Sequence, residues 1–98
     1  MDIQNEASAG TAESGDARVT VRPNPGKGLA LELRGPSVVR YGESIKTAAA
    51  ATLAALGISD ASVTIEEKGA LDATIQARLA SACVRAGDGK AVPWEAMP

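Results

Sequence analysis

Few side chains in this chain could do chemistry, and the most informative of them is a serine near the N-terminus. The sequence has no histidine, which removes the commonest general base and metal ligand. Ser14 lies in residues 9–16 (AGTAESGD), a stretch too polar and too rich in glycine for a core element. Gly15 makes the backbone deformable, and Glu13 and Asp16 keep it solvated, so an enzyme could take up and modify the Ser14 hydroxyl. By composition alone such a stretch is more often a plain linker.

Other reactive groups are weaker candidates. Cys83 falls four residues after Leu79 on the apolar stripe of a predicted helix, so we expect a buried thiol rather than a nucleophile. Glu66 and Glu67 are adjacent in a predicted strand and therefore point to opposite faces, which prevents them from acting together as an acid and a base. The sequence contains no cluster of metal ligands and no GxGxxG phosphate loop. We therefore expect neither a catalytic residue nor a metal site.

The elements that must position these groups follow from the apolar pattern. Residues 17–22, 29–34 and 61–66 alternate apolar and polar side chains, as half-buried strands do. The prolines and glycines of residues 23–28 favour a turn, so we expect the first two strands to form a hairpin.

Two further segments have a helical period, residues 42–56 and 71–86, and each is followed by a glycine, Gly57 and Gly87. The order β-β-α-β-α predicts an α+β fold, a small two-layer sandwich. We expect residues 1–16 to be a flexible arm and residues 17–98 to be a single domain with a C-terminal tail.

Composition limits the possible partners. The net charge is −2 and the ten lysine and arginine residues are scattered, so nucleic acid is not an expected partner. The N-terminus has neither the basic nor the apolar region of a signal peptide, and no apolar run is long enough for a membrane span. The single cysteine cannot form an internal disulfide, which favours a reducing, cytoplasmic location.

Three blocks of the sequence resemble the acyl carrier (gamma) subunit of citrate lyase. Residues 10–16 (GTAESGD) resemble the attachment segment of that family. Residues 68–72 (KGALD), followed by 77–79 (ARL), resemble a turn and helix start that these carriers share, and residues 93–95 (PWE) resemble their C-terminal end. The blocks have the spacing of the family, so the likeness covers nearly the whole chain. Ala12 departs from the pattern, because a leucine is expected there, and this could weaken docking of the arm on its transferase.

The resemblance implies that Ser14 carries 2'-(5''-phosphoribosyl)-3'-dephospho-CoA through a phosphodiester bond, with Glu13, Gly15 and Asp16 as recognition context. The thiol of this arm would hold an acetyl thioester. An alpha subunit would exchange acetate for citrate, and a beta subunit would cleave the citryl thioester to oxaloacetate and restore the acetyl thioester. A prosthetic-group transferase and an acetate-activating ligase are implied as further partners. The chain itself would be a carrier subunit, not an enzyme.

Two alternatives remain. The carrier subunit of malonate decarboxylase uses the same type of arm, although residues 13–16 and 93–95 favour citrate lyase. A non-catalytic interaction module with a disordered N-terminal arm would leave Ser14 unmodified. The phosphopantetheine carriers, which are helical bundles with an Asp-Ser-Leu motif, are excluded because this sequence has three strand patterns and no Asp-Ser pair.

Three further side chains keep more than one interpretation. Trp94 is the one tryptophan, and it either packs on its own domain or anchors the chain to a partner. Arg18 and Arg22 fall on the outer face of the first predicted strand. That face is ordinarily solvated, although these guanidinium groups could also steady phosphates of the arm.

Overall fold

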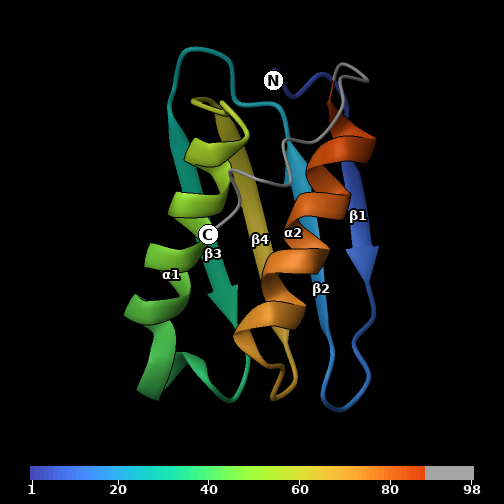
Figure 1. Cartoon of the computed structure of the whole chain (residues 1–98), viewed down its shortest axis with the longest axis vertical. Helices are drawn as coiled ribbons and strands as arrows, with labels where there is room; N and C mark the ends of the chain where they lie inside the picture. Colours follow the sequence, from blue (N-terminus) through green and yellow to red (C-terminus); the bar gives the residue numbers. More distant parts are fainter. Residues whose placement is uncertain (88–98) are drawn as a thin grey trace.

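The structure, a computed structural model that describes residues 1–87, has two layers: a β-sheet, and two helices on one of its faces (Figure 1). The elements in chain order are β1 (Ala7–Gly10), β2 (Ala17–Arg22), β3 (Leu29–Arg34), α1 (Val38–Ala55), β4 (Ala61–Glu67) and α2 (Asp72–Ala86). The strands form one sheet in the order β1-β2-β4-β3. The predicted α+β two-layer sandwich is confirmed, with one strand more than predicted.

The apolar face of the sheet follows from the alternation of side chains in its strands. The register of β2 and β4 sets Val19 opposite Ile65 and Val21 opposite Val63. All four side chains are buried beneath the helices. Because every second residue of a strand points to the same face, the alternation read from the sequence is enough to form this half of the core.

The opposite face of the sheet is polar. Arg18 and Glu66 are opposite each other in the register, and Nη2 of Arg18 lies 3.7 Å from an oxygen of Glu66. Arg22 forms an ion pair with Glu6. The predicted placement of Arg18 and Arg22 on the outer face is confirmed. A sheet with a polar face can leave that face in water, so one layer of helices completes the fold.

The predicted hairpin between the strands at 17–22 and 29–34 is wrong. β4 lies between β2 and β3, antiparallel to β2 and parallel to β3. Parallel neighbours cannot be joined by a tight turn, and here α1 provides the crossover from β3 to β4. β4 is also the strand with the most buried residues, as is typical of a central position. Residues 23–28 therefore cross the width of β4 rather than closing a hairpin.

The N-terminal segment contains a strand that the sequence pattern did not predict. β1 pairs antiparallel with β2, and Ala9 and Ile3 are buried. The Gln4 N–H donates to the Ala86 carbonyl at 2.8 Å and so satisfies an acceptor at the end of α2. Alanine, serine and glycine have low strand propensity, so pairing with β2 and packing against α2 are what make this segment a strand. The first strand was predicted at residues 17–22, and β1 precedes it. The predicted flexibility of residues 1–16 stays a prediction.

Both helices lie near their predicted positions. α1 begins a few residues earlier than expected, at Val38. Its end is as predicted, because Gly57 follows it with φ +70°. The Gly57 N–H donates to the Ala54 carbonyl at 3.0 Å, and the Ile58 N–H donates to the Leu53 carbonyl at 2.9 Å. These two bonds form a Schellman motif.

The core between the layers contains few large side chains, and the chain has no phenylalanine. Small alanine side chains on the buried stripes of α1 and α2 allow the helices to lie close to the sheet and to each other. The largest fully buried apolar side chains are Leu53, Ile65, Leu79, Val19, Val21 and Val63. Each of them therefore makes a large contribution to a small core.

Neither helix within residues 1–87 has the length and apolar character needed to cross a membrane. The C-terminal tail, with Trp94 and residues 93–95, lies outside the described residues, so the two interpretations of Trp94 stay predictions.

Replacing Leu53 by alanine is expected to lower the free energy of unfolding by about 2–5 kcal/mol, because Leu53 is fully buried and a thin core leaves a cavity unfilled. Urea unfolding followed by circular dichroism measures the loss. The matched control is Leu71→Ala, the same change at a side chain that is 76% exposed, and it should shift stability by less than about 0.5 kcal/mol. Equal losses in the two variants would contradict the packing described for α1.

Candidate functional site

Ser14 lies in the turn that joins β1 to β2, at the end of the sheet where both helices begin (Figure 1). The Asp16 N–H donates to the Glu13 carbonyl at 3.0 Å, so Ser14 and Gly15 are the central residues of a β-turn. Gly15 has φ +80°, as the third position of a type II turn requires. Ser14 is exposed, and within residues 1–87 its hydroxyl has no hydrogen-bond partner. The turn therefore presents a free serine hydroxyl to solvent.

The carboxylate of Asp16 connects this turn to α2. It accepts hydrogen bonds from the Thr11 hydroxyl at 2.7 Å and from the Ala17 N–H at 2.7 Å. Nε and Nη2 of Arg78 donate to its two oxygens, each at 3.1 Å. The hydrogen bonds from Thr11, and then those from Arg78 and Ala17, hold the pKa of Asp16 well below its usual 3.8, because they favour the charged carboxylate. The sequence predicted Asp16 only as recognition context, and this structural role was missed.

Backbone contacts hold the turn against its neighbours. The Gly15 N–H donates to the Lys68 carbonyl at 2.7 Å, and the Lys68 N–H donates to the Asp16 carbonyl at 2.9 Å. Gly10, with φ +92°, lies so close to β2 that a Cβ there would be 1.9 Å from the Ala17 carbonyl oxygen. Any larger residue at position 10 must therefore move β1 away from β2. The structure thus brings together two segments that the sequence analysis singled out separately, the Ser14 turn and the loop after β4.

Glu67, at the end of β4, is a buried carboxylate whose structural role the sequence analysis missed. It is 1% exposed and accepts hydrogen bonds from the Ser37 N–H at 2.6 Å and the Gly69 N–H at 2.7 Å. It therefore ties the loop before α1 to the loop before α2. Burial by itself raises the pKa of Glu67, but the hydrogen bonds from Ser37, Gly69 and Ala70 outweigh burial and lower it. The sequence did contain a sign that Glu67 is buried. Glu67 is two residues after Ile65 in a predicted strand, so its side chain points to the same apolar face.

The other reactive groups take the positions predicted for them. Glu66 lies beside Arg18 on the polar face of the sheet whereas Glu67 points into the core, so the two carboxylates do not form an acid–base pair. Cys83 is fully buried on α2, and burial raises the pKa of its thiol to about 12. Within residues 1–87 no three or more His, Cys, Asp or Glu side chains are placed to hold a metal ion.

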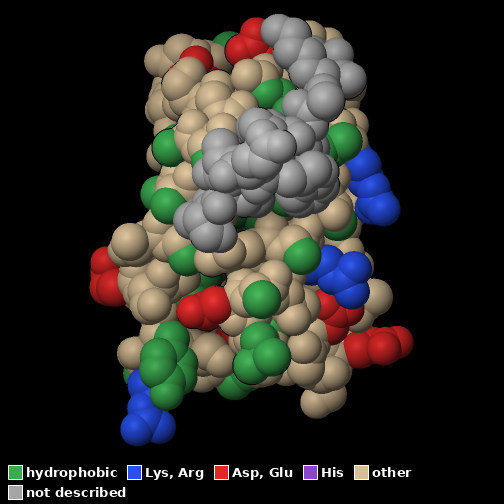
Figure 2. All heavy atoms as spheres, in the orientation of Figure 1, with side chains coloured by type: hydrophobic (Ala, Val, Ile, Leu, Met, Phe, Trp, Pro, Cys, Tyr) green, Lys and Arg blue, Asp and Glu red, His purple; other side chains and the backbone are tan. Residues whose placement is uncertain are grey.

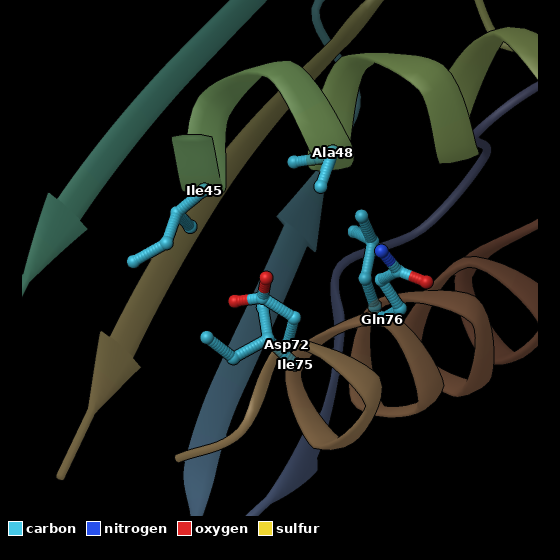
Figure 3. A pocket seen from close by; sticks show the side chains of 7 residues that line it. Ile45, Ala48, Asp72, Ile75 and Gln76 are labelled. Carbon is cyan, nitrogen blue, oxygen red and sulfur yellow. The ribbon is translucent and has the colours of Figure 1, made fainter. Parts of the chain in front are cut away.

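A hollow between the two helices is one further candidate for a binding site (Figure 3). In Figure 3, Ile45 and Ala48 reach into it from α1, and Asp72, Ile75 and Gln76 come from α2. Its lining is apolar apart from one carboxylate and one amide. A lone carboxylate without a partner base, nucleophile or cation provides no reactive centre. The hollow therefore gives no alternative to Ser14 as the place where chemistry occurs.

Comparison with known proteins finds relatives along nearly the whole chain. The sequence model of one protein family, described as "ACP: Malonate decarboxylase delta subunit (MdcD)", matches residues 4–86. A citrate lyase acyl carrier protein of Lacticaseibacillus casei is 42% identical over 95 residues, which cover 97% of this chain and 93% of that protein. Proteins of the same name from Pectobacterium carotovorum and Vibrio cholerae are 41% and 43% identical. The first covers 99% of this chain and 100% of that protein, and the second covers 96% of each.

The thiol of Cys83 should react with iodoacetamide at least about a hundredfold more slowly in the folded chain than in the chain unfolded by urea. Burial blocks the reagent, and the pKa of about 12 leaves little thiolate at pH 8. Mass spectrometry of samples quenched over time measures the labelling. The same rate in both states would contradict the burial of this thiol.

Replacing Glu67 by glutamine should lower the free energy of unfolding at pH 7 by about 1–3 kcal/mol, because an amide cannot accept hydrogen bonds at both of its terminal atoms. The pH dependence should also change. The pKa of Glu67 is lowered in the folded chain, so its carboxylate stabilises the fold above its usual pKa of 4.5 and this stability is lost as the pH falls through the folded-state pKa. Glu67→Gln should therefore lose less stability on acidification than the unaltered chain.

Urea unfolding at intervals between pH 7 and pH 3 measures both effects. Glu66→Gln is the matched control, since it makes the same change at the neighbouring residue, whose side chain is partly exposed beside Arg18. It should have little effect on stability at pH 7 or on the slope with pH. Identical pH profiles for the two variants would show that the buried carboxylate does not have the assigned role.

Proposed function

Because the chain belongs to the citrate lyase acyl carrier protein family, we propose that it is the acyl carrier subunit of a citrate lyase. The observation that carries this proposal is the identity of 41–43% with carriers of that name over nearly the whole chain. The chain is then a carrier subunit rather than a catalyst. Its task is to present a covalently held acyl group to the active sites of other subunits.

Ser14 is the proposed attachment point for phosphoribosyl-dephospho-CoA, joined through a phosphodiester. The hydroxyl is suited to a large covalent group because it is exposed on a turn and has no hydrogen-bond partner within residues 1–87. Attachment forms an Oγ–P bond while the bond from that phosphorus to the leaving phosphate of an activated donor breaks and the hydroxyl proton is released. It breaks no hydrogen bond of the Ser14 side chain within residues 1–87. When bound, the group supplies a thiol on a long arm, which carries acyl groups as thioesters while citrate is cleaved to acetate and oxaloacetate.

The residues of the chain itself support this role in two ways. Hydrogen bonds at Gly15 and Asp16 hold the base of the attachment turn. Cys83 is buried and its pKa is raised to about 12, so it does not compete with another thiol for acyl groups. The sequence also contains no histidine, so no imidazole of this chain can promote hydrolysis of a thioester.

Apolar side chains at the Ser14 end are suited to docking on other proteins. Figure 2 shows apolar side chains at the surface near the start of the helices, and Val39, Tyr41 and Leu71 are exposed there. Exposed large apolar side chains among charged ones are typical of protein contact surfaces. The proposed partners are the alpha (acyl transferase) and beta (citryl lyase) subunits, the prosthetic-group transferase and the acetate-activating ligase. The free, buried Cys83 favours the cytoplasm as their common location.

A second candidate function is the acyl carrier of a malonate decarboxylase. It is favoured by the description of the matching family, which names the delta subunit of that enzyme. Both functions use Ser14 in the same way. Analysis of the acyl group on the carrier separates them, because a citryl group indicates citrate lyase and a malonyl group indicates the decarboxylase. An acetyl group does not distinguish them, since decarboxylation of a malonyl thioester also leaves an acetyl thioester.

Co-expression of the chain with its cognate transferase should raise its intact mass by one phosphoribosyl-dephospho-CoA group. Peptide mapping should place the added mass on Ser14, because this hydroxyl is exposed and free. Ser14→Ala should abolish the increase completely, and expression without the transferase should give the unmodified mass.

The matched control is Ser59→Ala. Ser59 is also exposed, but it lies between α1 and β4 at the opposite end of the sheet, so its replacement should leave the mass increase unchanged. An unmodified chain beside a transferase that modifies a known carrier would refute the proposed function. Added mass on a residue other than Ser14 would refute the assigned site.

A further inference from the structure

We propose that the ion pair between Asp16 and Arg78 is a latch: it holds the turn that carries Ser14 in place, and so fixes the direction of the Cα–Cβ bond of Ser14. Both would be positioning residues for attachment of the prosthetic group. This inference rests on the proposed function, because attachment is the step in which the direction of the hydroxyl matters. This proposal differs from the predicted flexible arm over residues 1–16, since it makes the turn at residues 13–16 an ordered part of the domain.

The geometry of the latch fixes orientation as well as distance. Arg78 donates from Nε and Nη2 to the two separate oxygens of Asp16, each at 3.1 Å. Two parallel bonds between planar groups restrict rotation about the contact. The Asp16 side chain is only 17% exposed, and it also accepts from Thr11 and Ala17. With these additional donors, the carboxylate has little freedom to turn.

The close approach of Arg78 depends on a glycine in β1. A Cβ at Gly10 would lie 3.0 Å from Cδ of Arg78 and 1.9 Å from the Ala17 carbonyl oxygen. The missing side chain therefore leaves room for the stem of Arg78 to pass the end of β1 and reach Asp16. Residue 78 is 62 positions from residue 16 in the sequence, yet residues 10, 16 and 78 all take part in the same contact.

Ser14 depends on this contact because it has no hydrogen bond of its own within residues 1–87. The turn sets the direction of the Cα–Cβ bond of Ser14, and backbone hydrogen bonds at Gly15 and Asp16 hold the turn. A nucleophilic oxygen must lie in line with the phosphorus atom that it attacks, and a misplacement of about 1 Å can cost about a hundredfold in rate. A turn that is ordered in advance also saves the transferase the entropy of ordering it.

The test compares two arginines of α2. Arg78→Met keeps most of the aliphatic stem and removes the guanidinium. Arg85→Met makes the same change further along α2, where Arg85 donates to the Ser8 carbonyl at 2.8 Å instead of to the turn. With the cognate transferase and its activated prosthetic-group donor, kcat/KM for attachment should fall at least about tenfold for Arg78→Met and less than about twofold for Arg85→Met. Arg78→Lys, which keeps the charge without the planar fork, should recover part of the loss.

A second measurement needs no transferase. The Gly15 amide, which donates to the Lys68 carbonyl, should exchange with deuterium at least about tenfold faster in Arg78→Met, because the turn opens more often. The amides of β4 should keep their exchange rates, which separates release of the turn from a general loss of stability. Arg85→Met should leave the Gly15 amide unchanged.

The outcomes distinguish the latch from the proposed function. If the unaltered chain is modified at Ser14 and Arg78→Met reacts like Arg85→Met, the latch is wrong and the proposed function stands. If attachment slows but the Gly15 amide exchanges as before, Arg78 contacts the transferase and the latch is also wrong. If the unaltered chain is not modified at all, the proposed function fails. The exchange measurement still tests the latch in that case, because an unchanged exchange rate of the Gly15 amide in Arg78→Met would overturn it.

Discussion

The end of the molecule that carries Ser14 depends on one buried charge, the carboxylate of Glu67. Its hydrogen bonds join the loops before α1 and α2, and the next residue, Lys68, is bonded through its backbone to the Ser14 turn. Gly35 leaves the space that the carboxylate occupies, since a Cβ there would lie 2.4 Å from Oε1 of Glu67. A buried charge is tolerated only where hydrogen bonds replace its water. The N–H groups of the loops therefore stabilise the buried carboxylate, and the carboxylate in turn holds the loops in position.

Away from this end, the fold is held by small apolar contacts spread over both layers. The alanines of α1 and α2 permit close packing but bury little area each, and the chain lacks phenylalanine. A small domain of this kind has a modest margin of stability. The hydrogen bonds that the carboxylates of Glu67 and Asp16 accept hold the loops in place, which a core this small could not do by apolar packing alone.

Local patterns in the sequence were sufficient to predict most of the elements but not their arrangement. The alternating residues of β2 and β3 match their predicted ranges, because one face of each strand is more apolar and less exposed than the other; that face is buried in β2 and only partly buried in β3. β1 was missed because its small residues become a strand only against β2 and α2. The insertion of β4 between β2 and β3 depends on the crossover through α1, which no local pattern shows.

The same division applies to the candidate site. Ser14 was predicted as the attachment site from the resemblance of residues 10–16 to a family segment, whereas its neighbours in the sequence predicted only an exposed, deformable stretch. The contact between Asp16 and Arg78 joins residues separated by 62 positions, so neither residue type nor spacing could predict it. Glu67 was within reach of prediction, because a charged residue on the inward side of a strand requires a partner.

The fastened turn has a consequence for any group tethered to it. The effective concentration of a tethered group at a distant site falls roughly as the −3/2 power of the tether length once the tether exceeds the span. A loose segment ahead of β2 would add its own length to the tether. If the turn between β1 and β2 is held as proposed, a group on Ser14 would instead sweep a volume set by its own length. The position at which the domain docks would then determine which active site the tethered group reaches. A partner that shifts the docked domain would move the attachment point with it, without any change in the length of the tether.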